Sequence, residues 1–103
     1  MSSFHKTKKW ELKRLIILRR DEYMCQECKR YGKTTAAKTV HHIHPLDERP
    51  DLELVNINLI SLCNDHHEKM HDRTNDKLSA LGMEWVRRIA IKVSPPTLWL
   101  EFK

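Results

Sequence analysis

The sequence predicts a small α+β fold in which helices flank two short extended segments. Three observations support this prediction. Apolar residues recur at helical spacing near both ends of the chain. Two short runs rich in apolar and β-branched residues lie in the centre, separated by a polar loop. Two pairs of metal-binding residues with equal spacing, one before the first run and one after the second, indicate that these parts of the chain meet in space.

The size and composition fit one domain over residues 1–103. A chain of 103 residues can bury one modest core, and domains of this size often gain stability from a metal or a disulfide. The hydrophobic content of 40% is that of a globular protein. The chain lacks both an apolar run long enough for a transmembrane helix and the apolar core of a secretion signal. We therefore expect a cytoplasmic protein without membrane contact, whose three cysteines are reduced.

The net charge of +5 is distributed unevenly along the chain. Residues 1–40 carry 11 Lys and Arg against 4 Asp and Glu, a net of +7, and residues 41–103 carry 8 against 10, a net of −2. A basic half favours a polyanionic partner such as nucleic acid, with contacts to phosphates. The same charge would also suit a helix face that is simply solvated.

The first expected helix runs from Lys8 to about Tyr23, after a polar arm at residues 1–7. Its apolar stripe has the spacing i, i+3, i+4 and i+7 at Leu12, Leu15, Ile16 and Arg19, and is widened by Trp10, Ile17 and Leu18. The basic residues that lie largely off this stripe are Lys9, Lys13, Arg14 and Arg20. We expect these four side chains to bind backbone phosphates if the partner is a nucleic acid, and the alternative role of such a helix is to cover the core.

The centre and the C-terminal part of the chain complete the expected fold. The central elements are an extended segment at 38–46, a polar loop at 47–58, a second apolar run at 59–63 and a helix from Asn64 to about Arg73, capped by Asn64 or Asp65. The C-terminal elements are a helix from Asn75 or Asp76 to about Val93, which Gly82 disfavours, and a short strand at 97–102. The tryptophans are expected to anchor the core at positions Trp10, Trp85 and Trp99.

Two matched pairs predict a structural zinc site. Cys25-x2-Cys28 can present two thiolates to one tetrahedral ion, and Cys63-x2-His66 supplies a second pair with the same spacing. One pair on a loop and one at the start of a helix is the treble-clef arrangement. The bound ion would contribute directly to the folding energy of this small domain.

The remaining histidines form a second cluster in the sequence. His67 and His71 are four residues apart on an expected helix, so both could bind one divalent metal. His41 and His42 lie in the extended segment VHHIH. One of these two could be a third ligand, and the other a base, because neutral imidazole is available at pH 7.

Together these motifs resemble those of the HNH endonuclease family. The resemblance rests on CQEC at 25–28, VHHI at 40–43 and VNINLISLCNDHHEKMH at 55–71, and spans about residues 10–73. It implies a ββα-metal (His-Me finger) core with a zinc-binding treble clef and flanking helices. The C-terminal helix and strand at 75–103 would follow this core. The family usually has a cysteine where this sequence has His66. Histidine can also serve as a zinc ligand, so the change preserves a complete set of four.

The resemblance also implies a role for each matching residue. His42 would be the general base, and Asn58, rather than Asn56, would hold the hairpin loop or the base by hydrogen bonds. The implied ligands of one catalytic divalent metal (Mg²⁺, Mn²⁺, Ni²⁺ or Zn²⁺) are His41, His67 and His71. His44 is expected to pack or to face solvent.

The implied activity is hydrolysis of DNA phosphodiester bonds that leaves 5′-phosphate and 3′-hydroxyl ends. Expected partners are DNA and, as in phage relatives, terminase subunits; the protein itself would be a monomer or weak dimer. The alternatives are a noncatalytic zinc-stabilised DNA-binding module, which would have no use for the second histidine cluster, and a nuclease that acts on RNA or as a toxin.

Overall fold

The computed structural model of the chain describes residues 7–72, 74 and 77–93. In chain order the helices and strands are α1 (Lys8–Arg20), α2 (Gln26–Arg30), β1 (Thr39–His42), β2 (Leu59–Leu62), α3 (Asn64–Lys69), β3 (His71–Asp72), β4 (Lys77–Leu78) and α4 (Ala80–Arg88). Short 3-10 helices are η2 (Pro50–Leu52), η3 (Asn56–Asn58) and η4 (Ala90–Lys92). Among these residues, no helix is long and apolar enough to cross a membrane.

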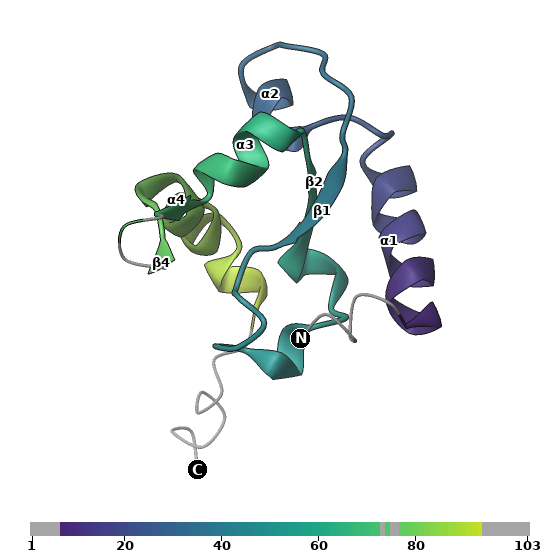
Figure 1. Ribbon diagram of the computed structural model, residues 1–103, viewed down its shortest axis with the longest axis vertical. Coiled ribbons are helices and arrows are strands. Elements are labelled where there is room, and N and C mark those ends of the chain that lie inside the picture. The colour runs from purple at the N-terminus through teal and green to yellow at the C-terminus, as the bar shows by residue number, and fades with distance from the viewer. Residues whose placement is uncertain (1–6, 73, 75–76, 94–103) are drawn as a thin grey trace.

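The antiparallel β1–β2 pair is the centre of the fold, with helices on both of its faces (Figure 1). One face packs on α1, through a cluster of Trp10, Ile17, Leu18, Val40 and Leu59. The other face packs on α2, α3 and α4, through a larger cluster that includes Ile43, Ile60, Leu62, Met70 and Ile89. Because both faces are covered, all four residues of β2 are buried. This explains why the run LISL is apolar without strict alternation.

The expected apolar stripe of α1 is correct only in part. The helix begins at Lys8, capped by the Thr7 side chain, and buries Trp10, Ile17 and Leu18, the residues that were expected to widen the stripe. The central residues of the expected stripe are exposed, at 63% for Leu12, 41% for Leu15 and 49% for Ile16. This helix is apolar on two sides, and contact with β2 decides which side is buried.

The end of α1 is fixed to β2 by polar contacts. The helix stops at Arg20 rather than at Tyr23, because Glu22 and Tyr23 adopt left-handed backbone angles. The buried Asp21 carboxylate accepts a hydrogen bond from the Ser61 amide at 3.0 Å. The Arg20 guanidinium pairs with Asp21 and donates to the Leu59 carbonyl at 2.7 Å.

The helix expected from Asn64 to about Arg73 is α3, and it is shorter than the sequence indicated. It is capped by Cys63, not by Asn64 or Asp65, and ends at Lys69 instead of Arg73. Ser79 explains this end, because its amide donates to the Met70 carbonyl and its hydroxyl donates to the Lys69 carbonyl. The chain then forms β3, which pairs with β4.

The fourth helix begins at Ala80, not at Asn75 or Asp76, and ends at Arg88, before η4. Ser79 is its N-cap, so the same serine ends one helix and begins the next. Gly82 sits where a Cβ atom would lie 2.4 Å from the Met70 carbonyl oxygen. The glycine that disfavoured a helix in the sequence is therefore required by close packing. The expected strand at 97–102, with Trp99, lies outside the described residues.

Candidate functional site

Three cysteines and one histidine converge between α2 and α3. The Nδ1 atom of His66 lies 3.6, 3.3 and 3.4 Å from the Sγ atoms of Cys25, Cys28 and Cys63, and the Sγ atoms of Cys28 and Cys63 are 4.0 Å apart. A tetrahedral zinc ion, with bonds of about 2.3 Å to sulfur and about 2.0 Å to nitrogen, separates its ligand atoms by roughly 3.5–3.8 Å. The four side chains therefore fit a single zinc ion.

The local fold explains why these four residues meet. Cys25 and Cys63 are the N-caps of α2 and α3, so each pair of ligands spans the first turn of a helix. All three cysteines are free and buried. Burial raises the pKa of the Cys25 thiol to about 11, so an uncompensated thiolate is disfavoured at this position, whereas at Cys63 burial is outweighed by hydrogen bonds within the cluster, which lower its pKa. A bound cation would supply the compensating charge.

A second group consists of His41, His67 and His71. Their ligand atoms all lie within 4.8 Å of one another, so small side-chain rotations would allow one ion to bind all three. His41 is buried, and its Nε2 atom has no hydrogen-bond partner among the described residues. An orphaned buried nitrogen that faces two more imidazoles fits a divalent metal.

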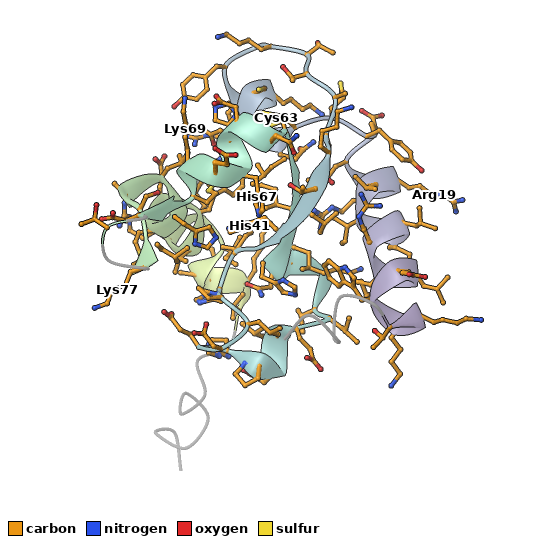
Figure 2. The ribbon with its side chains drawn as sticks, viewed as in Figure 1. Arg19, His41, Cys63, His67, Lys69 and Lys77 are labelled. Atoms are coloured by element: carbon orange, nitrogen blue, oxygen red, sulfur yellow. The ribbon has the colours of Figure 1, made fainter. Side chains whose placement is uncertain are left out.

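The protonation of these histidines suits a metal. Burial, together with the nearby His67, His71 and His42, lowers the pKa of His41 to about 3. Burial and His71 also lower the pKa of His67. At neutral pH both are therefore neutral, the form that binds metal. Figure 2 shows His41 and His67 close together, and their ring centroids are 5.6 Å apart.

The sequence suggested that His67 and His71 share a helix, and this prediction is wrong. His67 is on α3 and His71 is on β3, with ring centroids 6.3 Å apart. Burial decreases from His41 to the half-buried His67 and the exposed His71. The three-residue group is thus open on one side, whereas the four-residue group is closed. Open sites with three protein ligands are typical of catalytic metals, and closed sites of structural ones.

His42 points to the other face of β1, where its contacts include a backbone carbonyl and an aromatic ring. Its Nε2 atom lies 3.0 Å from the Glu53 carbonyl oxygen, which can only accept a hydrogen bond. Nε2 therefore carries the proton in this contact, and Nδ1 of the neutral ring is the nitrogen that can accept one. The imidazole also stacks on Trp10, with centroids 5.0 Å apart and planes 21° apart.

Asn58 is fully buried and fastens the loop between β1 and β2. Its Oδ1 accepts from the His44 amide at 2.7 Å, and its Nδ2 donates to the carbonyls of His44 and Leu52, each at 3.3 Å. Leu52 precedes Glu53, so Asn58 helps to position the carbonyl that holds His42. Asn56, in contrast, is exposed and accepts a hydrogen bond from Lys13.

One open cleft of about 430 Å³ reaches both His42 and the three-histidine group. Residues of α1, β1, α3 and β3 line it, and Figure 1 shows α1 and α3 on either side of β1. Its lining includes His41, His42, His67 and His71, together with the basic residues Arg14 and Lys38. His44 lines a different cavity, beside Arg49, where burial and Arg49 lower its pKa.

The four predicted phosphate contacts lie in different settings. Arg14 lines the cleft and donates to the Lys38 carbonyl at 3.3 Å, and Lys9 is exposed. Lys13 reaches Asn56, and Arg20 is occupied by Asp21 and the Leu59 carbonyl. Sequence reasoning missed three features of the cleft because no sequence motif marks them. They are Lys38, the Glu53 carbonyl that binds His42, and the stack of Trp10 on His42.

Comparison with known proteins identifies the family. The family model described as HNH endonuclease matches residues 25–73. A solved structure of an HNH endonuclease from the deep-sea thermophilic bacteriophage GVE2, with a manganese ion, is 39% identical, covers 65% of this chain and 73% of that chain, and has a TM-score of 0.64. The chain belongs to the HNH endonuclease family. No curated protein gives a significant match.

The expected family and fold class are therefore confirmed. As an HNH endonuclease, the protein is a hydrolase that cleaves DNA. In this HNH enzyme the small α+β core consists of β1, β2 and α3. The loop that Asn58 fastens connects β1 to β2, and α3 follows β2.

Replacing Asn58 should loosen this loop. Asn58→Ala leaves the His44 amide without its acceptor, so we expect a loss of roughly 1–3 kcal/mol in the free energy of unfolding. Hydrogen exchange should speed up at residues 44–55. Asn56→Ala, at an exposed position two residues earlier, is the matched control and should change neither quantity appreciably. Equal effects of the two variants in chemical denaturation would contradict this role of Asn58.

Proposed function

We propose that this HNH endonuclease hydrolyses DNA phosphodiester bonds with His42 as general base and with one divalent metal bound by His41, His67 and His71. The observation that supports this most directly is the shared cleft, in which His42 and all three proposed ligands face one space. The noncatalytic DNA-binding alternative gives no reason for this convergence. It also gives no reason for the orphaned Nε2 atom of His41.

The residues of the chain divide the reaction between them. His42 accepts a proton at Nδ1 from a water molecule in the cleft, and that water attacks phosphorus. The bond to the 3′ oxygen breaks, and that oxygen takes a proton from solvent water, leaving 5′-phosphate and 3′-hydroxyl ends. The Glu53 carbonyl keeps its hydrogen bond to Nε2–H and so stabilises the imidazolium that forms. When bound, the divalent metal neutralises negative charge on the phosphate and the departing oxygen.

We further propose that Cys25, Cys28, Cys63 and His66 bind a structural zinc ion. The distances between ligand atoms and the closed, buried setting support zinc over a redox role for the CxxC pair. The relative from phage GVE2 was solved with manganese, which favours Mn²⁺ among the candidates Mg²⁺, Mn²⁺, Ni²⁺ and Zn²⁺ for the catalytic position. Terminase association, a monomer or weak dimer, and a cytoplasmic location stay predictions.

Loss of the base should abolish most cleavage. Converting supercoiled plasmid to nicked circles with Mn²⁺ measures the rate directly, and His42→Ala should lower it by about 10²–10⁴-fold, because proton transfer to a positioned side chain is lost. His44→Ala is the matched control, since this histidine lies two residues away but faces another cavity. If wild type binds DNA and never cuts with any metal, the DNA-binding module becomes the better reading.

Loss of a zinc ligand should unfold or strongly destabilise the domain. Cys63→Ser should remove the structural ion and lower the thermal midpoint by roughly 15 °C or more, since structural zinc contributes several kcal/mol to folding. Mass spectrometry under native conditions measures the ion directly. The control is His67→Ala with His71→Ala, which should retain this zinc. Retention of zinc by Cys63→Ser and its loss from the double variant would exchange the roles of the two groups.

Basic residues at the cleft should bind phosphates without regard to sequence. Arg14→Gln should weaken binding to unrelated DNA duplexes equally and reduce the slope of log Kd against log salt by about 1, as expected for one lost phosphate contact. Arg87→Gln removes the same charge from an exposed position of α4 and is the control. A loss of affinity on one DNA sequence only would contradict a phosphate contact.

A further inference from the structure

Trp10 forms one wall of the catalytic cleft. Its indole lies 5.0 Å from the His42 ring, in a nearly parallel stack, and is 4% exposed. It lines the cleft together with the proposed base and metal ligands. Trp10 also belongs to the buried cluster between α1 and the β1–β2 pair. The expected role as a core anchor therefore describes only one side of this residue.

The helix that carries Trp10 is fixed at both ends. The Trp10 amide donates to the Thr7 hydroxyl oxygen at 3.2 Å, which caps the first turn of α1. At the other end, Asp21 and Arg20 bind the backbone of β2. Because β2 pairs with β1 in a defined register, the indole and the imidazole are held by one rigid frame. A rigid frame is what a positioned catalytic group requires.

The stack restrains His42 in a direction that its hydrogen bond does not. The Glu53 carbonyl fixes Nε2 but allows the imidazole to rock about that contact. An aromatic face against the ring prevents this motion. Trp10 thus acts on the position of the ring.

We propose that Trp10 is a positioning residue that acts on cleavage through His42, an inference that rests on the proposed role of His42 as base. Trp10→Leu should lower kcat about 10-fold or more, because the orientation of the His42 ring is lost. KM should change little, because only 4% of Trp10 is exposed and the indole therefore offers little surface to DNA. Trp10→Phe keeps an aromatic face and should recover most of the rate.

A double-mutant cycle separates this role from a structural one. Single-turnover nicking is measured for wild type, Trp10→Leu, His42→Ala and the combined variant, each loaded with structural zinc and supplied with Mn²⁺. If Trp10 acts through His42, adding Trp10→Leu to His42→Ala should lower the nicking rate by less than about twofold. The effects of two coupled residues are not additive. Ile17→Ala is the control, because Ile17 packs in the same cluster but does not line the cleft.

A measurement without DNA complements the cycle. Ring-nitrogen NMR of His42 should show one tautomer, protonated at Nε2, in wild type and in Ile17→Ala. The Trp10→Leu spectrum should show mixed tautomers and lose the ring-current shift of the imidazole protons. The role of Trp10 would be overturned if Trp10→Leu lowered the rate equally in wild type and in His42→Ala and left the ring-nitrogen spectrum of His42 unchanged. Full activity of His42→Ala would instead overturn the proposed base, and the inference with it.

Discussion

The register of β1 on β2 is the constraint on which the rest of the site depends. His41 pairs with Ile60 and His42 pairs with Leu59, so neighbouring histidines point to opposite faces of a two-stranded sheet. A slip by one residue would exchange the faces. His41 would then meet the indole of α1, and His42 would meet the imidazoles of α3 and β3. The division between proposed metal ligand and proposed base is therefore a property of strand pairing.

Two opposite faces can serve one reaction because, among the described residues, the sheet has two strands. The edge of β1 that lies away from β2 lets the cleft reach both faces at once, from Trp10 on one side to His67 on the other. A further strand along that edge would separate the two faces. The helices then supply what the strands lack. α1 encloses His42, and α3 with the turn at Met70 brings two more imidazoles to His41.

Sequence reasoning predicted the parts of this molecule that depend on local spacing. Equal CxxC and CxxH spacing predicted the four-residue cluster, and VHHI predicted that β1 would contribute to the site. The failures arise where tertiary contact decides between similar local options. Leu12 and Ile16 have a good helical pattern, yet Trp10 and Ile17 face β2. Ser79 lies ten residues after Lys69, beyond the range of local sequence patterns. The sequence around α3 therefore gave no sign that the helix would end at Lys69.

The cleft also limits how this nuclease can select its target. Its basic residues, Arg14 and Lys38, are suited to phosphates, and contacts to phosphates position a duplex without reading its bases. Each cleft holds one proposed base and one proposed metal group, enough to cut one strand at a time. Selection of a particular site would then require sequence-dependent DNA shape or a second protein.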